Sequence, residues 1–179
     1  MRAMNRREAV KTTGALLSGM LITSTGLTAC KGETRNIGAG VLNAEDQALV
    51  EEIADTLLPT TANSPGAKAA GVGPVINLLL TDCREPAEQK RVVDGLKQFR
   101  STVGDHFASM SQADRENWLR RIDAEARTNK EHYFNLIREL SLHAYFSSQI
   151  GATKALRYIM TPGKWVGCVP YQPGQPAWA

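Results

Sequence analysis

The chain has 179 residues, which is enough for one domain with a buried core. Its formal net charge of +3 arises at the N-terminus, where Arg2, Arg6, Arg7 and Lys11 are accompanied by a single acid, Glu8. The remaining residues are close to neutral in sum, so the charge gives no support to a nucleic-acid-binding function.

The first 29 residues predict an export signal. Arg6 and Arg7 precede a weakly apolar stretch, a pattern typical of twin-arginine signals. Residues 12–29 are uncharged and as long as a short membrane span, but about half of their positions are not apolar. A cleaved signal is therefore favoured, and a retained membrane anchor is the alternative.

Residues 27–30 resemble the processing box of bacterial lipoproteins, in which the cysteine becomes the lipidated first residue of the mature chain. We therefore expect a periplasmic protein that is tethered to the membrane through lipidated Cys30. The twin-arginine route carries proteins that are already folded. A protein that uses it either holds a cofactor itself or travels with a partner that holds one.

Residues 30–42 are polar and contain glycine, which predicts a tether ahead of a single domain at residues 43–179. In that domain apolar residues recur at helical spacing, so we expect an all-α fold, an irregular bundle of about five to six helices. Four helix starts are marked by a good N-cap residue or by a proline suited to a first turn. The predicted starts are Asn43, Pro74, Pro86 and Ser111.

The run from Val75 to Leu80 is also compatible with a buried strand, but no neighbouring segment offers a partner strand. The fifth helix is expected from about residue 130 to residue 150, with Gly151 ending it in a left-handed conformation. A short sixth helix is expected at residues 153–158. Prolines, glycines and aromatic residues then predict an extended tail that is pinned to its own domain or to a partner.

Two cysteines, Cys83 and Cys168, remain if Cys30 takes a lipid. In an exported protein two leftover cysteines usually pair, so we expect a disulfide between them. Two buried free thiols are the alternative.

The sequence contains no recognisable cofactor, metal or catalytic motif. Gly71-Val72-Gly73 lacks the third glycine of a dinucleotide fingerprint and follows no strand. There is no CxxCH haem motif, no GxSxG elbow, and no metal-ligand spacing among the histidines. We therefore assign no catalytic, cofactor-binding or metal-binding residue, which favours export beside a cofactor-bearing partner.

Several segments resemble the gluconate 2-dehydrogenase subunit 3 family. The longest and most specific is the block Tyr145-Phe146-Ser147-Ser148-Gln149-Ile150-Gly151-Ala152-Thr153-Lys154-Ala155-Leu156-Arg157-Tyr158. Further matching segments are Leu58-Pro59-Thr60-Thr61, residues 64–72, Gly95-Leu96, residues 162–171 and Ala177-Trp178. Together they cover nearly the whole domain that follows the signal.

The resemblance implies a small accessory subunit of a periplasmic sugar, polyol or glycoside dehydrogenase. The large partner of such a subunit belongs to the glucose-methanol-choline class and binds FAD, and a cytochrome c with haem c often takes the electrons. The small subunit typically carries the export signal for both. This implies a chain that is not an enzyme by itself and that holds no cofactor of its own.

Residues 145–158 and the tail through Trp178 are expected to form much of the partner interface, because aromatic residues and arginine are favoured at interface centres. The candidates are Tyr145, Phe146, Arg157, Tyr158, Trp165 and Trp178. Tyr145 and Phe146 could instead be core residues. Two other functions remain open: a free-standing helical envelope lipoprotein that binds a ligand or acts as a scaffold, and an enzyme in its own right.

Overall fold

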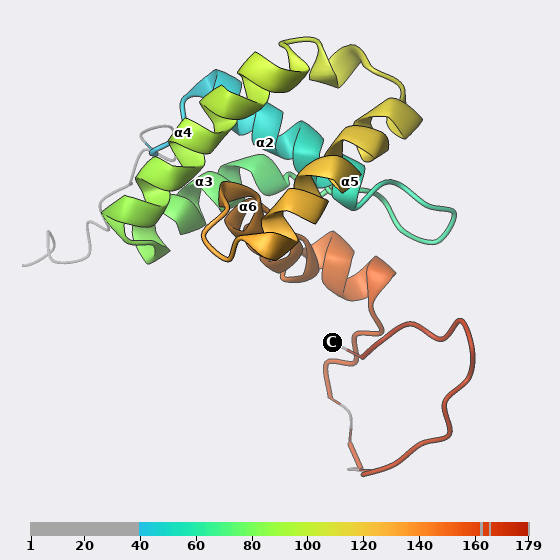
Figure 1. Cartoon of the computed structure of the whole chain (residues 1–179). Helices are drawn as coiled ribbons and strands as arrows, with labels where there is room; N and C mark the ends of the chain where they lie inside the picture. The colour runs from blue at the N-terminus through green and yellow to red at the C-terminus, as the bar shows by residue number, and fades with distance from the viewer. Residues whose placement is uncertain (1–39, 162, 165, 179) are drawn as a thin grey trace, which may run out of the picture. The chain divides into compact units, whose positions relative to one another are not determined.

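The computed structural model of the protein describes residues 40–161, 163–164 and 166–178. The predicted signal and lipidation site (Arg6, Arg7 and Cys30) and Trp165 lie outside these residues. The described part forms five α-helices, a 3-10 turn and a π-helical turn (Figure 1). They are α2 Ala44–Leu57, α3 Val72–Cys83, α4 Pro86–Val103, η2 Phe107–Ser109, α5 Gln112–Thr128, α6 Tyr133–Phe146 and η3 Gly151–Ala155.

The predicted all-α class is confirmed, since the described residues contain no strand beyond one isolated bridge. None of the helices in this part of the chain is long and apolar enough to cross a membrane.

Local capping chemistry explains where three of the helices begin. The side chain of Asn43 accepts a hydrogen bond from the backbone N–H of Asp46 at 2.8 Å, which starts α2. Ser111 does the same for the backbone N–H of Asp114 at 3.2 Å, which starts α5. Pro86 occupies the first turn of α4, where its missing N–H costs nothing. These three predicted starts are confirmed.

The second predicted helix is a helix rather than a strand, but it begins two residues before Pro74. Its N-cap is Gly71, with φ 64°, a left-handed conformation that favours glycine. The last turn of the preceding loop therefore continues directly into α3.

The fifth predicted helix is shorter at both ends than expected. It begins at Tyr133, where Nδ1 of His132 accepts a hydrogen bond from the backbone N–H of Phe134 at 3.3 Å. It ends at Phe146, and a π-helical turn at Gly151–Ala155 takes the place of the predicted sixth helix.

The predicted left-handed conformation of Gly151 is wrong, because its φ is not positive. A Cβ atom on Gly151 would lie 1.9 Å from the carbonyl oxygen of Tyr145. Glycine is needed here for the close approach of two backbone segments.

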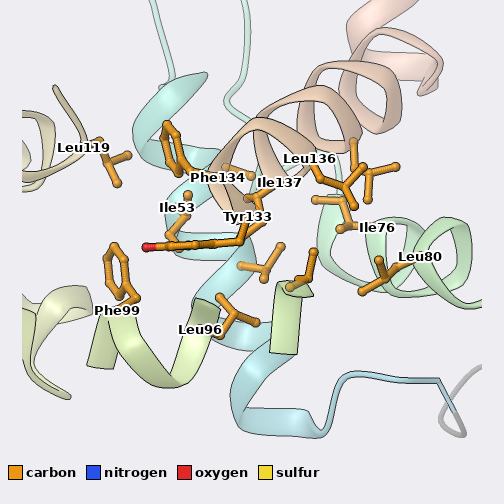
Figure 2. Close-up of a cluster of buried hydrophobic side chains, with 14 of the residues drawn as sticks. Ile53, Ile76, Leu80, Leu96, Phe99, Leu119, Tyr133, Phe134, Leu136 and Ile137 are labelled. Atoms are coloured by element: carbon orange, nitrogen blue, oxygen red, sulfur yellow. The ribbon is translucent and has the colours of Figure 1, made fainter. Parts of the chain in front are cut away.

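The core is built around α6, which packs against α2, α3, α4 and α5. Figure 2 shows side chains of α6 meeting side chains of these four helices in one cluster. The labelled members are Ile53, Ile76, Leu80, Leu96, Phe99, Leu119, Tyr133, Phe134, Leu136 and Ile137. Helices α2 to α6 therefore share a single apolar core.

Helices α4 and α6 pack closely where Gly95 faces the ring of Tyr133. A Cβ atom on Gly95 would lie 2.1 Å from Cγ of Tyr133. Burial raises the pKa of Tyr133 to about 12, and the carboxylate of Glu125 adds to this effect. The Tyr133 phenol is thus held neutral in an environment without enough water to solvate its anion.

Replacing Gly95 by alanine should destabilise the domain by about 1–3 kcal/mol, because the added methyl group collides with the buried Tyr133 ring. Urea unfolding followed by far-UV circular dichroism measures this loss. Ser101→Ala, at an exposed position of the same helix, should change the unfolding free energy by less than about 0.5 kcal/mol. Equal stability of the two variants would contradict the predicted collision.

Candidate functional site

Tyr145, the first residue of the long resembling block, lies in the core and not on the surface. It is only 4% exposed, as the alternative interpretation expected. Its ring meets that of Phe146 edge-on, with centroids 5.1 Å apart. Phe146 is 37% exposed and therefore remains accessible to a partner.

The Tyr145 hydroxyl joins α6 to the loop between α2 and α3. It donates a hydrogen bond to the carbonyl oxygen of Pro65 at 2.7 Å and lies 2.6 Å from Oγ of Ser64. Either hydroxyl can donate in the second contact, and the Ser64 hydroxyl also lies 3.3 Å from the Pro65 carbonyl oxygen, to which it can donate. The two segments that carry most of the resemblance are therefore in direct contact.

The same loop is held by hydrogen bonds to the end of α2. The backbone N–H of Gly66 donates to Oγ1 of Thr60 at 2.9 Å, and that of Lys68 donates to Oδ1 of Asp55 at 3.0 Å. A Cβ atom on Gly66 would lie 2.7 Å from Oδ1 of Asp55. The Pro-Gly segment is thus a structural brace, and its residue types are explained by close packing.

The C-terminal segment is fixed to the domain at its last described residues. The backbone N–H of Arg157 donates to the carbonyl oxygen of Ala177 at 2.7 Å, and Arg157 forms an isolated parallel bridge with Trp178. The guanidinium carbon of Arg157 lies 4.1 Å from the centroid of the Trp178 ring. These contacts make a cation–π pair between two residues that the sequence placed separately in the interface.

The predicted disulfide between Cys83 and Cys168 is not formed in the structure. Both cysteines are free, and both are exposed rather than buried. Cys83 is the last residue of α3, whereas Cys168 lies in the extended segment. The contacts of the tail with Arg157 come from Ala177 and Trp178, at the far end of the segment from its start.

The extended segment exposes an unusual number of large apolar side chains. Met160 and Tyr171 are 82% and 79% exposed. The others in this segment are Tyr158, Ile159, Val166, Val169 and Trp178. Of this set, the candidates predicted from the sequence include only Tyr158 and Trp178. The lack of regular structure between the prolines could also have indicated the others, which are Ile159, Met160, Val166, Val169 and Tyr171.

A groove of about 690 Å³ lies between the end of α2, α5 and α6. Asp123 lines the groove and pairs with two arginines. Its Oδ2 lies 2.8 Å from Nε of Arg127, and its Oδ1 pairs with Arg138. Arg120 pairs with Glu116 at 3.7 Å. Three arginines thus face two carboxylates in the groove, since Arg127 and Arg138 share Asp123. The described residues hold no cluster of metal-ligating side chains.

This arrangement is a helical domain with a braced loop and an exposed apolar C-terminal segment, a type of surface suited to contact with another protein. Residues 44–163 match the family described as Gluconate 2-dehydrogenase subunit 3. The chain belongs to that family, as the resemblance predicted. No curated protein and no solved structure matches it. The match ends at Gly163, so most of the exposed segment lies beyond the matched residues.

Replacing Tyr145 by phenylalanine should destabilise the domain by about 1–2 kcal/mol, because the hydrogen bonds of the phenolic hydroxyl to the Pro65 carbonyl oxygen and the Ser64 hydroxyl are lost. The helical circular-dichroism signal should be retained. Tyr171→Phe, which removes the hydroxyl of a side chain that is 79% exposed, is the matched control and should leave the urea midpoint unchanged. A Tyr145→Phe variant as stable as this control would show that the hydroxyl does not brace the loop.

Proposed function

We propose that this protein is the non-catalytic small subunit of a periplasmic FAD-dependent sugar or glycoside dehydrogenase of the glucose-methanol-choline class. In this proposal it escorts the large subunit through twin-arginine export, stabilises it, and tethers it to the membrane through Cys30. The family match over residues 44–163 is the observation that carries the proposal. FAD belongs to the large subunit, and haem c belongs to a cytochrome that accepts the electrons.

The exposed C-terminal segment supports a permanent partner. Apolar side chains between residues 158 and 178 remain in contact with water in the isolated chain. Removing such area from water is favourable by about 25 cal/mol per Å². A large subunit that covers this segment would gain binding energy from the side chains that the small domain does not use for its own core.

The N-terminal sequence supports the escort role. Arg6 and Arg7 form a signal for a route that accepts folded cargo, and FAD binds to a folded large subunit before export. A single signal on the small subunit would then serve both chains, provided that they associate in the cytoplasm. The order of events is flavin binding, assembly, export and lipidation.

Replacing both Arg6 and Arg7 by lysine should leave this protein and its large subunit in the cytoplasm. The measurement is flavin content and dye-linked sugar dehydrogenase activity in periplasmic and cytoplasmic fractions. Arg2→Lys, which keeps the arginine pair, is the matched control and should permit export. A large subunit that still reaches the periplasm in the double variant would refute the escort role. Isolation of this chain without a flavoprotein would favour the free-standing lipoprotein.

Replacing Cys30 by serine should release the complex from the membrane into the soluble periplasmic fraction. Two or more acyl chains give stable anchoring, whereas one chain gives only marginal binding. Intact-mass measurement of the mature chain should show a lipidated N-terminal Cys30. Cys83→Ser, a change at an exposed cysteine at the end of α3 and outside the C-terminal segment, should leave the complex membrane-bound. An unmodified mature N-terminus at any other residue would contradict the anchor.

A further inference from the structure

The segment from Arg157 to Trp178 is a closed loop and not a free tail. Its two ends meet through the hydrogen bond from Arg157 to Ala177, the isolated bridge, and the cation–π contact of 4.1 Å. Figure 1 shows this segment leaving the helices as an open arc and returning with its C-terminal end to the point of departure.

A tight turn directs the chain back to the base of the loop. The backbone N–H of Gln175 donates to the carbonyl oxygen of Gln172 at 3.0 Å. Pro173 and Gly174 lie between them, and Gly174 has φ 81°. Proline followed by a glycine with positive φ is the pattern of a type II turn. The return of the chain to Arg157 is thus specified by local sequence as well as by the contact at the base.

We propose that residues 157–178 bind the large dehydrogenase subunit as a closed recognition loop whose base is clasped by Arg157 and Trp178. This rests on the proposed function. Arg157 and Trp178 then act on each other and are positioning residues for the loop. Ile159, Met160 and Tyr171 contact the partner.

The composition of the loop defines the partner surface. Between residues 158 and 178 the sequence has one charged side chain, Lys164, whereas the large apolar side chains that the structure describes there are exposed. A surface that covers this loop must therefore be apolar and carry little charge, since charged groups facing it would lose water without gaining a partner.

Closure of the loop before binding favours association. A free segment of this length would lose conformational entropy when the partner orders it, whereas a clasped loop has lost part of that entropy already. An exposed cation–π pair corresponds to about a two- to fivefold change in an equilibrium constant. We expect the clasp to tighten binding of the large subunit by a factor of this size.

The test is a double-mutant cycle on the full chain, with binding to the FAD-loaded large subunit measured by titration. Arg157→Ala and Trp178→Ala should each weaken binding about two- to fivefold, and the double variant should bind no more weakly than the weaker single variant. Tyr171→Ala should weaken binding about tenfold or more, as expected for an aromatic anchor at an interface centre. Arg121→Ala is the matched control, because Arg121 lies 5.2 Å from the Trp118 ring in a similar pair on α5, and it should not change the affinity.

A second measurement follows the clasp in the free protein. The side-chain protons next to the Arg157 guanidinium should show an upfield ring-current shift in NMR spectra, and Trp178→Ala should abolish it. Absence of the shift in the wild-type chain would overturn the closed loop.

The binding outcomes separate the two proposals. Multiplying effects of Arg157→Ala and Trp178→Ala would show two independent partner contacts and overturn the clasp. Unchanged affinity in all loop variants, with tight binding of the wild-type chain, would overturn the loop alone. Failure of the wild-type chain to bind the flavoprotein would overturn both the loop and the proposed function.

Discussion

Helix α6 is the constraint on which the rest of the domain depends. Its buried residues face the four other α-helices, and Ser141, which is fully buried among them, satisfies its hydroxyl by donating to the carbonyl oxygen of Ile137 at 2.7 Å. The two ends of the helix are held by close contacts that permit little substitution, with Gly95 against Tyr133 and Gly151 against the Tyr145 carbonyl. The orientation of the C-terminal segment is therefore set by a helix that cannot shift without disturbing the whole core.

Buried polar contacts fix the elements around α6. Asn77 of α3 accepts a hydrogen bond from the backbone N–H of Leu42 at 3.0 Å and donates to the Leu42 carbonyl oxygen at 3.1 Å. This pairing fixes the chain just ahead of α2. The ion pair between Asp46 and Arg100 then joins the start of α2 to the end of α4. Because one side of that pair is nearly buried, loss of either partner would leave a poorly solvated charge.

The sequence predicted features that depend on neighbouring residues, such as helix starts. It missed contacts between residues that are far apart along the chain. Asn43, Pro86 and Ser111 mark helix starts because their chemistry acts on backbone groups within a few residues. Asn77 gave no such signal, since its partner, Leu42, is far away in the sequence and its neighbours are apolar. The same holds for the contact between Tyr145 and Ser64.

Two expectations at the candidate site were drawn from residue number and residue type alone. Pairing Cys83 with Cys168 followed from the number of cysteines, which contains no information on geometry. Naming Arg157 and Trp178 as separate interface residues followed from their types, which are indeed frequent in interfaces, but their preference for each other depends on the return of the chain at residues 172–175. Residue type indicated that Arg157 and Trp178 make contacts, but only the fold showed that they contact each other.

The structure distinguishes the helical core of the molecule from the C-terminal loop, whose exposed side chains are available for a partner. The braced loop and α6 hold each other through Tyr145 and lie within the residues that match the family. The C-terminal loop extends mostly beyond the matched residues, and none of its described apolar side chains is among those packed on the core. A domain that is stable through α6 can tolerate changes in such a loop, since substitutions there remove no core packing. In the proposed complex, stability would then come from the helical domain and partner recognition from the C-terminal loop that follows it.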